Sequence, residues 1–136
     1  MSFEIEKRIC FCDTDAGGVV YYSRYLDFCE EARLEFLLSL GLTQGTLGKD
    51  HNFALLVREC AVKYLKPARL EELVTVTVEN VVLSAPTLKM DHNIYDSRRS
   101  LLVTCRVVLV GVDGHGKPQR RYPAELTTRI CDTLDR

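Results

Sequence analysis

The residues best suited to chemistry lie near the N-terminus, in the segment Asp13-Thr14-Asp15-Ala16-Gly17-Gly18. A carboxylate can act as a nucleophile or as a general base, and paired glycines let the backbone bend tightly and approach a ligand closely. A helical pattern begins a few residues later, and free N–H groups at a helix N-terminus favour negative charge. One short stretch therefore meets two needs of acyl-transfer chemistry, attack on a carbonyl and stabilisation of the oxyanion.

This loop also has a purely structural interpretation, and other carboxylates are candidates for catalysis. On local physics alone, Asp15 is an ordinary loop or capping aspartate, because Asp-Gly loops before helices are common. Asp13 is expected to hydrogen-bond loop amides and to fix the turn. Glu31, on the expected helix, is the rival catalytic acid, although a salt bridge or a buried hydrogen bond is the favoured expectation for it.

The surrounding elements must position this segment. Alternating or continuous apolar patterns predict strands over residues 2–12, 53–65, 73–83, 87–95 and 101–112. A helical apolar stripe predicts one long helix over residues 23–40, ending before Gly41. Residues 43–51 read as a Gly-rich polar connection, and Pro123 opens a short terminal helix with Leu126, Ile130 and Leu134 at a spacing of four.

This order of elements predicts an α+β protein with a single domain over residues 1–136. Strands joined by short turns favour antiparallel pairing. A single long helix can cover only one face of the resulting sheet, so the other face is expected to be exposed or buried in an oligomer.

Composition excludes several classes of protein. The net charge of −1, from 18 basic and 19 acidic residues, provides no global attraction to nucleic acid or to an anionic membrane. The six cysteines form no Cys-x-x-Cys pair, and we expect them to be reduced structural residues, with no metal site. The charged, alternating N-terminus is no signal peptide, and no apolar run approaches the roughly 20 residues that span a bilayer. The protein is expected to be soluble and cytoplasmic.

The positions of the three histidines and the absence of two motifs exclude several kinds of catalytic site. The histidines are well separated along the chain and suggest neither a metal site nor a Ser-His-Asp arrangement; they are His51, His92 and His115. Gly-x-Ser-x-Gly, which marks the nucleophile of α/β-hydrolases, is absent, as is a Gly-rich phosphate loop.

Two blocks of sequence resemble a known family. The first is Asp13-Thr14-Asp15-Ala16-Gly17-Gly18-Val19-Val20-Tyr21, followed by Tyr25-Leu26 and Glu31-Ala32-Arg33. The second is Leu56-Val57-Arg58-Glu59, followed by Tyr64 and Pro67-Ala68-Arg69. Together they resemble the 4-hydroxybenzoyl-CoA thioesterase family, and within it the acyl-CoA thioesterases associated with the Tol-Pal gene cluster. The resemblance implies a hotdog fold, in which an antiparallel sheet of about five strands wraps around one long helix.

The resemblance also implies roles for particular residues. The second Asp of the Asp-x-Asp pair is the catalytic carboxylate of that family, which is Asp15 here. The backbone N–H at the start of the long helix, which belongs to Tyr22, polarises the thioester carbonyl. Many members have His at this position, but a backbone role survives any side chain. Gly18 and Val20, in the same segment, are expected to contact the substrate.

Binding of the coenzyme A phosphates is assigned by a departure from the family pattern. Some members use basic residues in the turn that matches Leu83 to Thr87, and here that turn carries no charge. Basic residues near the last strand are therefore the candidates, with a solvated basic face as the alternative; they are Lys117, Arg120 and Arg121, followed by Arg98 and Arg99.

The implied function is hydrolysis of an acyl-CoA thioester without a cofactor or metal, since a thiolate is a good leaving group. Family active sites form between two chains, so a homodimer or homotetramer is expected, with the acyl group beside the long helix. Two alternatives remain at this point. One is a hotdog dehydratase acting on acyl thioesters, although such enzymes typically use a His that this loop lacks. The other is a non-catalytic module that binds acyl-CoA or partner proteins.

Overall fold

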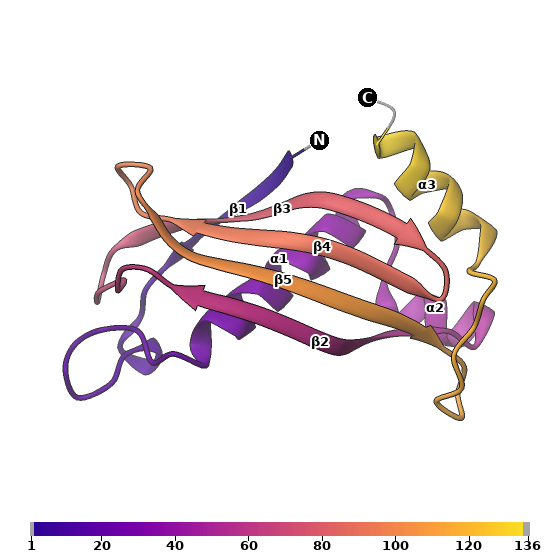
Figure 1. The fold of residues 1–136 in the computed structure, drawn as a ribbon, viewed down its shortest axis with the longest axis horizontal. Helices are drawn as coiled ribbons and strands as arrows, with labels where there is room; N and C mark the ends of the chain where they lie inside the picture. Colours follow the sequence, from indigo (N-terminus) through magenta and orange to yellow (C-terminus); the bar gives the residue numbers. More distant parts are fainter. Residues whose placement is uncertain (1, 135–136) are drawn as a thin grey trace.

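A computed structural model describes residues 2–134 of the chain, and its centre is one curved antiparallel sheet (Figure 1). The strands lie in the order β1-β3-β4-β5-β2. Their bounds are Ser2–Arg8 for β1, Ala54–Tyr64 for β2, Leu73–Ser84 for β3, Thr87–Tyr95 for β4 and Leu101–Val112 for β5. All four neighbouring pairs are antiparallel. Short connections join β3 to β4 and β4 to β5, and for these two pairs they predicted this direction.

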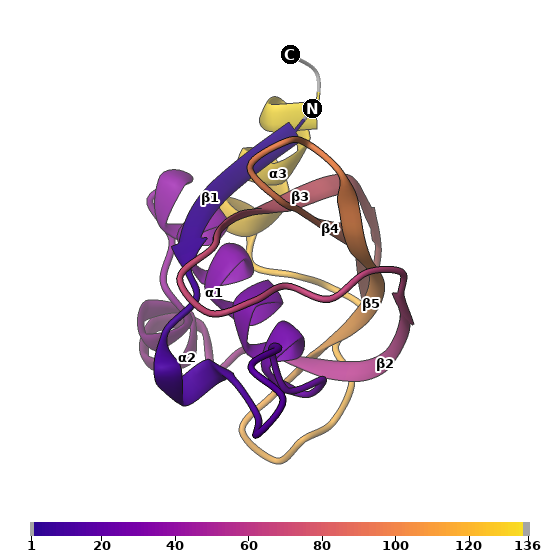
Figure 2. The same ribbon diagram turned by 90° about the vertical axis from the view of Figure 1, so that its left-hand side faces the viewer.

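The long helix α1, Arg24–Ser39, lies in the concave face of this sheet (Figure 2). Six of its residues are buried at the helical spacing that forms one wide face; they are Tyr25, Phe28, Cys29, Ala32, Phe36 and Leu37. They meet alternate residues of the sheet, including Val74, Val76 and Val78 of β3, all fully buried. The predicted α+β architecture, a sheet of five strands wrapped around one long helix, is confirmed.

The convex face of the sheet carries polar side chains. Arg106 of β5 donates a hydrogen bond of 2.8 Å to Asp91 of β4, and Asn93 bonds Glu79 across β4 and β3. The polar groups of these pairs thus have hydrogen-bond partners within the single chain.

The terminal helix α3, Ala124–Leu134, forms where Pro123 predicted it. Leu126 and Ile130 are fully buried, and Leu134 is exposed. Arg129 of α3 donates hydrogen bonds to the carbonyls of Leu40 and Gly41, which follow α1. These bonds satisfy carbonyl groups that a helix C-terminus leaves without partners.

Two segments differ from the predicted elements. Residues 43–51 are not an irregular connection, because Gln44–His51 form a helix, α2. Thr43 caps it by accepting a hydrogen bond from the Thr46 amide at 2.9 Å. The first strand ends at Arg8 and not at residue 12, because Phe11–Asp13 form a 3-10 turn, η1.

The cysteines also differ from expectation. All six are free, but only Cys29 and Cys105 are buried. The other four are exposed, so burial consistent with the expected structural role is seen for two of the six.

Candidate active site

Asp13 anchors the loop that precedes α1. Its side chain has no solvent exposure, and it accepts a 2.8 Å hydrogen bond from the Cys10 amide. The Arg24 guanidinium donates two more, at 2.7 and 3.1 Å. Burial opposes ionisation of Asp13, but the Cys10 amide, Arg24 and Lys7 outweigh it and lower the pKa of the carboxyl group. The prediction that Asp13 fixes the turn is confirmed.

The carboxylate of Asp15, in contrast, is presented to solvent. The loop closes beneath it through two backbone hydrogen bonds, from the Asp15 amide to the Val19 carbonyl and from the Gly18 amide to the Asp15 carbonyl. One side-chain oxygen accepts a hydrogen bond from the Gly17 amide at 2.8 Å. Gly18 has a φ of +77°, a region that favours glycine. The loop therefore holds a charged oxygen pair in place while leaving it accessible.

The start of α1 offers unpaired amide groups beside this loop. Ser23 precedes the helix without a side-chain hydrogen bond to cap it. The Tyr21 amide donates to the Asp13 carbonyl and the Arg24 amide to the Tyr21 carbonyl. Between them, the Tyr22 amide finds no hydrogen-bond acceptor in residues 2–134. A free N–H at a helix N-terminus is suited to holding an anionic oxygen.

The second sequence block folds against the first. Ala68, which is buried, accepts a hydrogen bond from the Val20 amide and donates one of 3.0 Å to the Tyr25 hydroxyl. Tyr64 donates from its hydroxyl to the Tyr22 carbonyl at 3.2 Å. Burial raises the pKa of Tyr25, and the negative charge of Asp15 adds to the effect. These contacts bring the Asp15 loop, the helix start and the end of β2 together.

A small hollow of about 260 Å³ lies at this meeting point, lined by Val20, Tyr22, Tyr25, Tyr64, Leu65, Lys66 and Pro67. Of the residues predicted to contact substrate, Val20 lines the hollow with Tyr22, and Gly18 lies on the loop that leads into it. Lys66, which sequence reasoning did not single out, is the cationic side chain among its lining residues.

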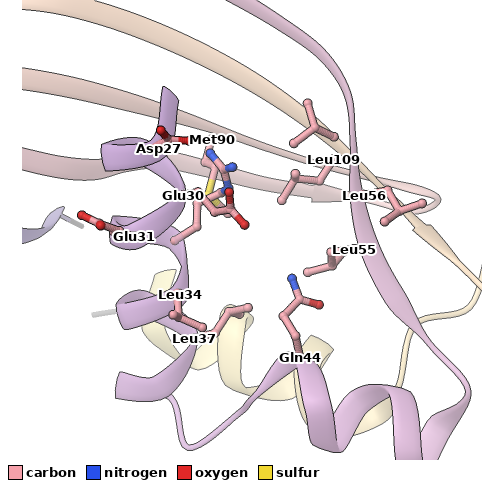
Figure 3. A pocket seen from close by; sticks show the side chains of 12 residues that line it. Asp27, Glu30, Glu31, Leu34, Leu37, Gln44, Leu55, Leu56, Met90 and Leu109 are labelled. Atoms are coloured by element: carbon pink, nitrogen blue, oxygen red, sulfur yellow. The ribbon is translucent and has the colours of Figure 1, made fainter. Parts of the chain in front are cut away.

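A larger groove of about 490 Å³ runs between α1 and β2 (Figure 3). Its walls are apolar on both sides, with Leu34 and Leu37 from α1 facing Leu55 and Leu56 from β2. Acidic side chains of α1 and one arginine also line it; they are Asp27, Glu30, Glu31 and Arg33. A groove of this size and lining is typical of a small-molecule site.

Glu31 departs from its predicted role. We expected a salt bridge or a buried hydrogen bond, but the side chain is exposed. Within residues 2–134 it has no basic partner within 4.0 Å. It belongs instead to the lining of the larger groove.

The predicted phosphate-binding residues do not lie beside Asp15 in the single chain. Tyr64, near the Asp15 loop, pairs with Val103, whereas Ala54 pairs with Val112 at the other end of the same two strands. At about 3.3 Å per residue the two ends are about 30 Å apart. Lys117, Arg120 and Arg121 follow Val112 and are exposed, at the end of the sheet opposite to the Asp15 loop (Figure 1).

Comparison with known proteins identifies the family. The family model of the thioesterase-like superfamily matches residues 11–130. This chain belongs to the thioesterase-like superfamily. The match includes the Asp15 loop, α1 and all strands except β1.

Members of the superfamily with known names are similar over most of their length. The acyl-CoA thioesterase YbgC of Haemophilus influenzae is 36% identical over 115 residues, which is 85% of this chain and 83% of that protein. The acyl-CoA thioester hydrolase YbgC of Escherichia coli O6:H1 is 33% identical over 94% of this chain and 95% of its own. The crystal structure of a 1,4-dihydroxy-2-naphthoyl-CoA thioesterase from Synechocystis has a TM-score of 0.89 and 27% identity, covering 100% and 99% of the two chains. The predicted hotdog fold is confirmed.

Proposed function

We propose that this protein hydrolyses acyl-CoA thioesters to a free acid and coenzyme A, with Asp15 as the catalytic carboxylate. The observation that carries the proposal is the placement of an accessible, loop-held carboxylate beside unpaired amides of a helix N-terminus. The names of the thioesterase relatives support the substrate class.

The chemistry follows from these two groups. In one route the Asp15 carboxylate attacks the thioester carbon, expels the coenzyme A thiolate and forms a mixed anhydride that water then cleaves. In the other, the carboxylate removes a proton from water as the water attacks. In both, negative charge develops on the carbonyl oxygen, and the Tyr22 N–H together with the α1 dipole stabilises it.

We also propose that the active protein is a homodimer paired through β2. This edge strand exposes apolar side chains that a lone strand leaves in water; they are Leu56, Val57, Tyr64 and the adjoining Leu65. The opposite edge, β1, is instead protected by charge, with Glu4, Glu6, Lys7 and Arg8 along it. Antiparallel pairing of two β2 strands would place the 113–121 segment of one chain close to the Asp15 loop of the other. Lys117, Arg120 and Arg121 would then be available to the coenzyme A phosphates.

The finer family assignment rests on the motif in residues 13–21. On that motif we place the protein with the Tol-Pal-associated acyl-CoA thioesterases and, accordingly, in the cytoplasm. None of the helices in residues 2–134 is both long and apolar enough to cross a bilayer.

The Asp15→Asn variant tests the mechanism. Asn can still accept the Gly17 hydrogen bond, so the loop is preserved while the negative charge is lost. Release of coenzyme A thiol from short, long and aromatic acyl-CoAs should fall by about a thousandfold or more in kcat. Asp132→Asn, an exposed position on α3, is the matched control and should retain activity.

Three outcomes bear on the proposal. Full activity of a folded Asp15→Asn protein would exclude the assigned mechanism. Tight binding of acyl-CoA without turnover by the wild type would favour the non-catalytic module. Hydration or dehydration of the acyl chain, without thiol release, would favour the dehydratase.

A further inference from the structure

Arg33 is an arginine of α1 that the proposed mechanism does not use. Its guanidinium lies 3.1 Å from Nε2 of His92, and Nδ1 of His92 lies 2.8 Å from the Thr77 carbonyl. Because a carbonyl oxygen only accepts, Nδ1 carries the proton and Nε2 accepts from Arg33. Burial lowers the pKa of His92 to about 4, so the imidazole is neutral at pH 7 and accepts from Arg33 without adding a second positive charge.

The remaining donors of Arg33 have no protein partner. No carboxylate in residues 2–134 lies within 4.0 Å of its guanidinium, and His92 is its one hydrogen-bond acceptor there. Burial lowers the pKa of Arg33, but a guanidinium keeps its proton at neutral pH. None of the solvent-inaccessible side-chain nitrogens in this part of the chain lacks a partner. In the single chain the free N–H groups of Arg33 are therefore accessible, and the surface that Arg33 lines is the α1–β2 groove.

The rest of the groove indicates what those donors would bind. Most of its wall is apolar, with Leu34, Leu37, Leu55, Met90 and Leu109 among the lining residues. Three carboxylates, Asp27, Glu30 and Glu31, line it as well. A substrate carboxylate would be repelled by these three acids as well as attracted by Arg33. A neutral hydroxyl or keto oxygen avoids that repulsion and can still accept from Arg33.

We propose that Arg33 is a specificity-determining residue that selects acyl groups carrying a neutral oxygen within the α1–β2 groove. The inference rests on the proposed function, because it takes the groove as the site of the acyl group. A purely hydrocarbon acyl group would displace water from the charged donors of Arg33 and offer them no acceptor in its place. The free-energy cost of these unpaired donors generates the selection.

The test compares acyl-CoAs that differ by one group. Octanoyl-CoA is compared with its 3-hydroxy and 8-hydroxy derivatives and with octanedioyl-CoA, and benzoyl-CoA with 4-hydroxybenzoyl-CoA. In the wild type, at least one hydroxylated substrate should exceed its parent in kcat/KM by about tenfold to a hundredfold. Arg33→Met should bring this ratio close to one, mainly by raising kcat/KM for the parent substrates, because their binding no longer removes water from a guanidinium. Arg33→Lys, which keeps the charge but not the fork of donors, should give an intermediate ratio.

Arg106→Met is the matched control, because Arg106 lies on the convex face of the sheet, away from the groove. The ratio of two substrates does not depend on the fraction of folded enzyme, so a general loss of stability would leave it unchanged. Three outcomes for Arg33→Met would each show a structural role and overturn the inference. They are an unaltered ratio of kcat/KM between hydroxylated and parent substrates, equal losses on every substrate, and dissociation of an oligomer. Preference for octanedioyl-CoA would overturn the choice of a neutral oxygen. Failure of the wild type to hydrolyse any of the six would instead refute the proposed function.

Discussion

The two aspartates of the Asp-x-Asp pair have different environments despite lying two residues apart. Asp13 is buried among amide and guanidinium donors, and Asp15 is open to solvent with one amide donor. Only the second is free to approach a substrate. The division of labour expected from the sequence, a structural first aspartate and a chemical second one, is consistent with this geometry.

Asp13→Asn is expected to lower the free energy of unfolding by about 1–3 kcal/mol at pH 7, because it weakens charged hydrogen bonds. The pKa of Asp13 is lower in the folded state than in the unfolded chain, near 3.9, so its ionisation stabilises the fold above that pH. That contribution is lost as the pH falls through the folded pKa. Urea denaturation of both proteins at pH 7 and pH 3 should show the difference shrinking in acid. An equal difference at both values would mean that packing, and not charge, is responsible.

Some contacts of the site gave no signal in the sequence. Arg24 was not singled out, and Tyr25 was named only as part of the family motif. Both hold the loop through partners 11 and 43 residues away, and such separations follow no helical or strand period. Asp15 and Tyr22 could be named because their family motif is local. Arg33 was visible only as part of that motif, since the absence of a carboxylate within 4.0 Å of its guanidinium in residues 2–134 is a property of the fold.

Helices and strands were predicted correctly where apolar residues recur with a regular period. The prediction failed where particular side chains favour a different local structure. The third to fifth strands of the sheet in chain order, β3, β4 and β5, match their predicted ranges to within one residue. β1 ended early because Asp13 bonds back to the Cys10 amide and turns the chain. α2 was missed because Gly45 and Gly48 weaken its helical propensity.

The same glycines make α2 a place to gain stability. A Cβ at Gly45 would meet nothing closer than 3.8 Å, and one at Gly48 nothing closer than 4.0 Å. Gly45→Ala and Gly48→Ala should each raise the free energy of unfolding by up to about 1 kcal/mol. Gly111→Ala in β5 is the contrasting variant, because its Cβ would lie 2.5 Å from the Phe53 ring, and it should destabilise. Thermal unfolding of the three variants measures both signs, and destabilisation by both α2 changes would contradict the assignment of a regular helix.

For the whole molecule, the unequal edges of the sheet predict its assembly. Val57 on β2 and Val82 on β3 are each 52% exposed, but only Val57 lies on the proposed interface. Val57→Lys should shift the protein towards monomer by placing a charge between paired strands, whereas Val82→Lys should leave the mass unchanged. Sedimentation of wild type and variants at several concentrations makes the comparison. A wild-type monomer, or a dimer that survives Val57→Lys, would require another interface.

The register of β2 and β5 separates the acidic and basic halves of the proposed site by the length of a strand. In a dimer paired through β2, each site would combine the Asp15 loop of one chain with the basic segment of the other. The activity of a defective chain would then depend on which chain it pairs with. Two chains mixed together, one without Asp15 and one without the basic segment, would build one complete site in each mixed dimer and restore turnover that neither supports alone.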